Sequence, residues 1–194
     1  RYTIHMDAAI EEYLTRENIE YIKIMPTYDT PPLPEGQFLN SAFTSKFKAL
    51  QIAEISDLIE RGVIVDGDTL FFSDIWFPGI ESIAYMKYFN KMDNLKITGM
   101  IHAGSFTDTD FVRDMERWAN KFEDIIFDIS DTIYCASNFI KNDIVKKRVV
   151  DPNKLVVSGL PVDYTGLDPH KGQVKKNIVT VSYTHLTLPT KWIV

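Results

Sequence analysis

The chain has 194 residues, of which 45% are hydrophobic and 25% charged, a composition typical of globular domains that bury a full core. Its formal net charge of −6 argues against nucleic acid or an anionic membrane as the main partner, because both need a basic face, although a local basic patch for peripheral membrane contact stays compatible. No apolar run is long enough to span a bilayer and the first residues lack the apolar core of a secretory signal, so we predict a cytoplasmic protein.

The first predicted elements are a helix over 8–14, capped by Asp7, and a short buried strand over 21–25. Because the chain opens at Arg1 without a methionine and runs straight towards this helix, we expect a first strand to be missing before it. Residues 26–41 are rich in Pro, Gly and Thr, which predicts a rigid connecting loop.

From residue 43 onwards, apolar strands alternate with amphipathic helices. The predicted helices cover 43–60, 80–89, 111–126 and 139–147, and the predicted strands cover 68–72, 96–102, 133–136 and 155–158. A capping-box-like signature, Thr107-x-x-Asp110, precedes the third of these helices. This alternation predicts an α/β fold, a Rossmann-like doubly wound parallel sheet covered by helices, in which ligands bind beyond the carboxyl ends of the strands.

The composition changes after the last predicted strand. Residues 159–176 combine Gly and Pro with scattered charge, which is typical of an interdomain linker, and 177–180 begin a new strand. We therefore expect a first domain over 1–158, a linker, and the opening of a truncated second domain.

The tail over 181–194 fits neither a helix nor a strand. The string Val181-Ser-Tyr-Thr-His-Leu-Thr-Leu-Pro-Thr190 resembles a translated sequencing-library adapter, and such segments are set aside before the fold is considered. We expect the native sequence to end near Thr180. The alternative is a natural strand and loop.

The single cysteine, Cys135, has no partner for an internal disulfide and lies in an apolar stretch. We predict a small buried hydrophobic residue in a reducing compartment rather than a nucleophile. No Cys or His pair has metal-ligand spacing, so no metal is expected, and neither a Gly-x-Gly-x-x-Gly after a strand nor a Walker loop supports a dehydrogenase or a nucleotide hydrolase.

Two segments carry a family resemblance. In 131–145 a strand ends in Ser137, which starts a helix, and 150–163 contains Val150-Asp-Pro-Asn-Lys154 before the last strand and a Gly-containing loop ending in Val-Asp after it. This order is similar to the end of the N-terminal domain of family-four glycosyltransferases of the GT-B fold. The family usually has Asn-Gly-Val-Asp where this chain has Ser158-Gly-Leu-Pro-Val-Asp163, which resembles other GT-B families and leaves the subfamily, donor sugar and stereochemistry open.

The resemblance implies that the chain is the N-terminal, acceptor-side half of a two-domain GT-B enzyme. Such an enzyme moves a sugar from a nucleotide-sugar donor to an acceptor, here an unknown carbohydrate, lipid or other molecule. The donor is a substrate rather than a cofactor, and its ligands belong to the missing C-terminal half, so the fragment alone should be inactive. A sugar-nucleotide epimerase of the same fold and a non-catalytic sugar-binding module are the alternatives.

His102 and Asp74 are the candidate catalytic residues. His102 ends a predicted strand beside a Gly-Ser turn, and the matching family position often carries a His that contacts the transferred sugar. Polar groups there act electrostatically, because transfer builds positive charge at the anomeric carbon and negative charge on the leaving phosphate. Asp74 follows a strand and is suited to bind acceptor hydroxyls or to act as a base. The alternatives are a satisfied His in an ordinary loop and a turn Asp before a helix.

Four further residues are candidates for substrate contact. Gly104 would let the backbone approach a ligand and Ser105 would offer a hydroxyl. Trp76 would stack on a sugar, with a buried aromatic as the alternative. Ser137 is predicted to cap its helix, and the resemblance adds contact with a ligand.

Overall fold

The structure is a computed structural model that describes residues 2–27 and 40–161. Most of the predicted loop over 26–41, the linker beyond Pro161, the expected second domain and the tail over 181–194 lie outside the described residues. Within the described part, the predicted α/β class is confirmed.

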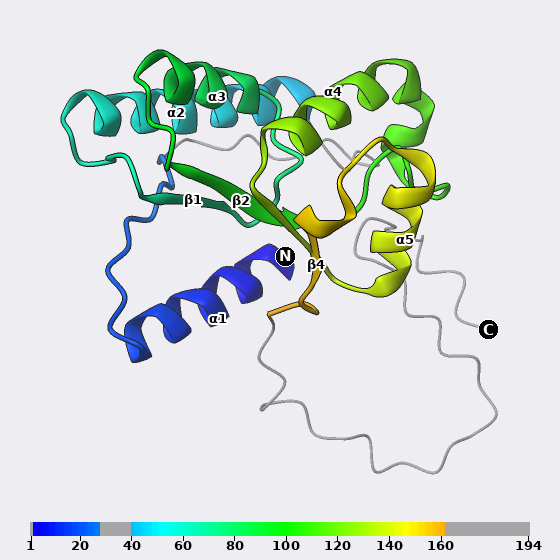
Figure 1. The fold of residues 1–194 in the computed structure, drawn as a ribbon, viewed down its shortest axis with the longest axis horizontal. Coiled ribbons are helices and arrows are strands. Elements are labelled where there is room, and N and C mark those ends of the chain that lie inside the picture. The colour runs from blue at the N-terminus through cyan, green and yellow to red at the C-terminus, as the bar shows by residue number, and fades with distance from the viewer. Residues whose placement is uncertain (1, 28–39, 162–194) are drawn as a thin grey trace, which may run out of the picture.

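A four-stranded parallel sheet forms the centre of the described part (Figure 1). Its strands are β1 (Thr69–Phe72), β2 (Lys96–Ile101), β3 (Thr132–Cys135) and β4 (Leu155–Val157). They lie side by side in chain order, so the described residues contain no reversal of strand order. Because all four strands are parallel, their carboxyl ends share one edge, and the loops that leave this edge are neighbours.

Helices connect the strands and pack on the sheet. They are α1 (Tyr2–Arg16), α2 (Ser41–Glu60), α3 (Ile80–Phe89), α4 (Glu116–Ile129) and α5 (Asn138–Lys147), with short 3-10 turns η1 (Phe111–Met115) and η2 (Pro152–Lys154). Figure 1 shows α2, α3 and α4 along one side of the sheet and α1 on the other. The predictions of the helices from α2 to α5, and of the four strands that join them, are confirmed to within a few residues, apart from the start of the α4 region.

Two predictions for the N-terminal segment are wrong. The first helix begins at Tyr2, so Asp7 lies inside α1 and does not cap it. Residues 21–25 form no strand, and Tyr21, Ile22 and Met25 are exposed. An apolar run becomes a strand only where a sheet edge accepts its backbone groups. Here the Gln51 side chain from α2 donates a hydrogen bond to the carbonyl of Ile24 (3.1 Å) instead.

The start of the α4 region also differs from the capping-box prediction. Asp110, not Thr107, is the capping residue, because its carboxylate accepts a hydrogen bond from the Val112 amide (2.9 Å). The Thr107 hydroxyl is buried and has no hydrogen-bond partner among the described residues. The chain after Asp110 first makes the tighter turn η1 and becomes α-helical at Glu116.

The hydrophobic core lies against the sheet face that carries Leu70, Ile97 and Ile133. Leu70 is paired with Ile97, and Ile133 is paired with Gly99, two residues further along β2. Each fully buried aliphatic side chain of this kind stabilises the fold by about 1.5–3 kcal/mol. Gly99 of β2 lies opposite Phe72 in the same register, where an added Cβ would stand 2.5 Å from the Phe72 carbonyl oxygen. The close approach of backbone and side chain at this point therefore requires glycine.

We predict that Gly99→Ala lowers the free energy of unfolding by about 1–3 kcal/mol or more, because backbone as well as side chain must move. Urea denaturation measures it. Gly62→Ala is the matched control, since Gly62 has φ +66° with nothing within 4 Å of an added Cβ. It should cost only the left-handed strain of about 1 kcal/mol. An equal loss in the two variants would contradict the crowding argument.

Cys135 generates a prediction about pH. It is completely buried in the core, and burial raises the pKa of its thiol to about 11. An unfolded thiol titrates near about 8.5, so between these values the unfolded chain holds fewer protons and the thiol's contribution to stability falls as pH rises. The difference in unfolding free energy between wild type and Cys135→Ala should therefore shrink across this range. A difference that is constant with pH would contradict it.

Candidate functional site

The candidate residues gather at the carboxyl edge of the sheet. Asp74 and Trp76 follow β1, residues 102–106 follow β2, and Ser137 follows β3. The topology thus brings the loops that carry them together, as the sequence predicted. Their roles in binding or catalysis stay predictions, and the contacts of each are described below.

His102 is half-buried, and its Nε2 lies 2.8 Å from the carbonyl oxygen of Ser73, just after β1. A carbonyl oxygen only accepts, so this nitrogen carries the proton and donates it. In the neutral imidazole, Nδ1 is then the acceptor. The contact joins the ends of β1 and β2 and fixes which ring nitrogen carries the proton.

Asp74 forms the turn that leads from β1 towards α3. Its Oδ1 accepts a hydrogen bond from the Trp76 amide (3.1 Å), which is the geometry of a turn aspartate. Lys48 of α2 lies nearby, with its ammonium 4.3 Å from the centre of the Phe77 ring. Burial lowers the pKa of Lys48, and the negative charge of Asp74 acts in the opposite direction. Asp74 therefore combines the predicted turn role with an electrostatic interaction across to α2.

Trp76 is held by other aromatic side chains and by one hydrogen bond. Its ring meets Trp118 and Phe122 edge-on, with centroids 5.8 and 5.0 Å away, and its indole N–H donates to Glu123 Oε1 (3.2 Å). The half-buried position and these partners match the alternative of a buried aromatic.

Gly104 and Ser105 are packed against α4. A Cβ at Gly104 would stand 2.5 Å from Phe106 Cε1 and 2.6 Å from Glu123 Oε1, so protein packing alone requires glycine here. Ser105 is completely buried. Its amide donates to Glu123 Oε1 (2.6 Å), and its hydroxyl lies 2.8 Å from Glu123 Oε2. In this structure both residues contact Glu123, and the predicted contact with a ligand is untested.

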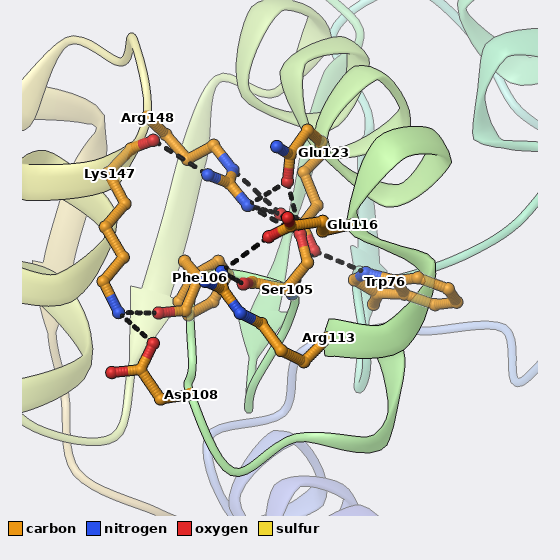
Figure 2. A network of polar contacts seen from close by, with 10 residues as sticks. Trp76, Ser105, Phe106, Asp108, Arg113, Glu116, Glu123, Lys147 and Arg148 are labelled. Atoms are coloured by element: carbon orange, nitrogen blue, oxygen red, sulfur yellow. Dashed lines mark hydrogen bonds and ion pairs between the residues drawn. The ribbon is translucent and has the colours of Figure 1, made fainter.

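A buried ion pair between Glu123 and Arg148 lies at the centre of these contacts (Figure 2). Arg148 NH2 is 2.9 Å from Glu123 Oε2, and the two side chains are 7% and 0% exposed. The guanidinium also donates to Asn120 Oδ1 (2.5 Å), to the Ser105 hydroxyl (2.6 Å) and to the Lys147 carbonyl (2.8 Å). The pair therefore connects the loop after β2, helix α4 and the end of α5.

Two further cations hold the same loop. Lys147 donates to the Phe106 carbonyl (2.6 Å) and pairs with Asp108 (2.9 Å). The hydrogen bond from Lys147 to the Asp108 carboxylate is the main reason that the pKa of Asp108 is lowered. Arg113 donates to the Ser105 carbonyl (2.9 Å). The loop after β2 is thus bonded to α4, to η1 and to the end of α5.

Sequence reasoning missed Glu123, Asn120 and Arg148. Glu123 does carry a signal, because it follows Ala119 by four residues and precedes Phe127 by four, and both of these are buried. A carboxylate on the buried face of a helix indicates a paired charge. Arg148 carries no such signal, because it follows two lysines and looks like part of a solvated basic end.

Ser137 caps α5 as predicted, since its hydroxyl accepts a hydrogen bond from the Ile140 amide (3.4 Å). Within residues 2–27 and 40–161, no group of three His, Cys, Asp or Glu side chains is arranged to hold a metal ion. None of the helices described there has the length and apolarity that a membrane span requires.

No protein-family model matches the chain. No curated protein sequence matches it either. The resemblance to GT-B glycosyltransferases therefore depends on the residues quoted for it above.

We predict that removing one member of the buried pair is strongly destabilising. Glu123→Ala or Arg148→Ala should each lower the free energy of unfolding by about 3–5 kcal/mol, because the remaining charge stays buried and unpaired. The double variant should cost less than the sum of the two, with a coupling of about 0.5–3 kcal/mol by urea denaturation.

The control is Glu116→Ala, which breaks an exposed pair with Arg113 whose side chains are 51% and 40% exposed. It should change stability by less than about 1 kcal/mol. Purely additive losses at Glu123 and Arg148 would contradict the importance of the pair.

Proposed function

We propose that this chain is the acceptor-side domain of a GT-B-type glycosyltransferase that uses a nucleotide-sugar donor, with the donor-binding domain outside the described residues. The proposal includes a Rossmann-like, doubly wound sheet for the complete domain, and a cytoplasmic location. Its supports are the parallel α/β sheet, the polar residues at the carboxyl edge, and the resemblance over 131–145 and 150–163.

The observation that carries the proposal is the position of His102. It leaves the carboxyl end of β2 in the region where parallel α/β sheets bind ligands. The hydrogen bond from its Nε2 to the Ser73 carbonyl joins the loops after β1 and β2 at this edge and orients the ring. An imidazole oriented in this way is suited to a polar contact with the transferred sugar, and Asp74 lies in the neighbouring loop, suited to the hydroxyl of the acceptor.

A non-catalytic sugar-binding module is the second candidate. The observation that favours it is that Trp76, Ser105 and Asp74 each have hydrogen-bond partners within the protein. Side chains that already have hydrogen-bond partners in the protein are as well suited to a stable binding surface as to a reaction.

We predict that His102→Ala in the full-length product of the natural gene lowers turnover with a nucleotide sugar about 100-fold, because a preorganised polar contact at the transferred sugar is lost. The free energy of unfolding should fall by only about 1 kcal/mol, the typical cost of one hydrogen bond. Turnover is measured as release of nucleoside diphosphate or monophosphate from a panel of donors.

The matched control is His5→Ala, which removes an exposed histidine of α1 and should leave turnover unchanged. Wild-type protein that binds sugars but turns over no donor would favour the binding module. Equal losses of turnover in the two variants would contradict the assigned role of His102.

A further inference from the structure

Ser73 makes two polar contacts, one through its backbone carbonyl and one through its side-chain hydroxyl. Its carbonyl oxygen accepts the Nε2 proton of His102 (2.8 Å), and its hydroxyl donates to Oδ1 of Asp7 (2.5 Å). The three residues come from α1, from the loop after β1 and from the loop after β2, and all are half-buried. A chain of contacts thus runs from a carboxylate on one helix to the candidate histidine.

We propose that Ser73 is a positioning residue through which the Asp7 carboxylate fixes the imidazole of His102. The inference deepens the proposed function, because it assumes that His102 contacts the substrate. Neither Ser73 nor Asp7 is assigned a contact with the substrate itself.

The arrangement differs from a nucleophilic serine triad. An activated serine donates its hydroxyl proton to the histidine, whereas here the hydroxyl is directed to Asp7 and only the carbonyl meets the ring. Asp7 has no hydrogen bond to the imidazole among the contacts above. The chain of contacts therefore has no route for proton transfer from serine to histidine, and its effect is on geometry.

The geometric effect follows from where the restraints act. Ser73 is the first residue after β1, beyond the pairing of the strand with β2. The next backbone anchor in this loop is the hydrogen bond from the Ile75 amide to the Met100 carbonyl (2.8 Å). Between these points, the bond to Asp7 fixes the Ser73 side chain, and with it the orientation of the residue whose carbonyl holds His102. Hydrogen bonds to a charged acceptor are roughly twice as strong as neutral ones, so this restraint is substantial.

Helix α1 is itself held in place beside the contact. Met6, the neighbour of Asp7, is completely buried, and α1 lies on the side of the sheet opposite α2 and α3 (Figure 1). The carboxylate thus sits on an anchored element. A displacement of about 1 Å at a group that orients a substrate can lower the rate about 100-fold. A restraint that holds the imidazole in place therefore preserves the rate.

The test measures how fast the Nε2 proton of His102 exchanges with water, by NMR of the ¹⁵N-labelled 194-residue chain, with His102→Ala assigning the resonance. Ser73→Ala and Asp7→Ala should each speed this exchange about tenfold, since each removes the charge-assisted bond. The double variant should exchange no faster than either single one. Ser73→Thr, which keeps a hydroxyl, should restore slow exchange.

The matched control is Glu12→Ala, which removes an exposed carboxylate from the same helix and should leave the exchange rate unchanged. Unchanged exchange in Ser73→Ala, or in Asp7→Ala, overturns the proposal, and so does an equal acceleration in Glu12→Ala. If Ser73→Ala loses its native near-ultraviolet circular dichroism, Asp7→Asn decides, because its amide oxygen still accepts and exchange should rise less than in Asp7→Ala.

The readout needs no donor and no turnover, so it separates this inference from the proposed function. Slow exchange that depends on Ser73 and Asp7, in a full-length protein inactive with every donor, would uphold the positioning and reject the transferase. In an active full-length enzyme, Ser73→Ala should lower kcat several-fold and Ser73→Thr should restore it.

Discussion

The carboxylate of Glu123 is completely buried, and much of the carboxyl edge of the sheet is arranged around it. A buried charge is tolerated only when it is paired and fully hydrogen-bonded. The Glu123 carboxylate is reached by donors from Trp76, Ser105 and Arg148, which come from three different segments of the chain. Each of those segments must therefore approach α4 at a fixed distance. The lack of space for a Cβ at Gly104 is a direct result of this approach.

This constraint divides the candidate residues into two groups. Trp76, Gly104 and Ser105 were singled out for chemistry by their residue types and positions, and in the structure they contact Glu123. His102 lies in the same loop and bonds the Ser73 carbonyl at the end of β1. The loop thus has a fixed base against α4 and a histidine that bonds a second loop. A rigid support behind one polar group is what a binding or catalytic site needs, because the cost of ordering the group has already been met by folding.

The positions of the helices and strands from α2 to β4 could be predicted from the sequence, whereas the conformation of the apolar run at 21–25 could not. The alternation of apolar segments locates the helices and strands from α2 to β4. It does not fix which side chains are buried, since Trp118 of α4 and Phe139 of α5 are 50% and 67% exposed. The apolar run at 21–25 has a similar local pattern but forms no strand, because the outcome depended on a neighbouring strand edge that no local pattern reports. The edge on which His102 and Asp74 lie followed from the topology, whereas the contacts did not. The partners of Ser105 lie 18 and 43 residues away, at Glu123 and Arg148.

Asp7 shows the same limit of local sequence pattern. As a helix cap, Asp7 would have accepted a hydrogen bond from a backbone amide in the first turn of the helix. Inside α1 it instead accepts a hydrogen bond from the hydroxyl of Ser73, 66 positions further along the chain. The loop after β1 is therefore restrained by α1 through Ser73 and by α4 through Trp76, and the loop after β2 is restrained by α4 through Ser105. The hydrogen bond between the His102 ring and the Ser73 carbonyl joins these two anchored loops. The orientation of the ring therefore depends on contacts made by α1 and α4 as well as on its own loop.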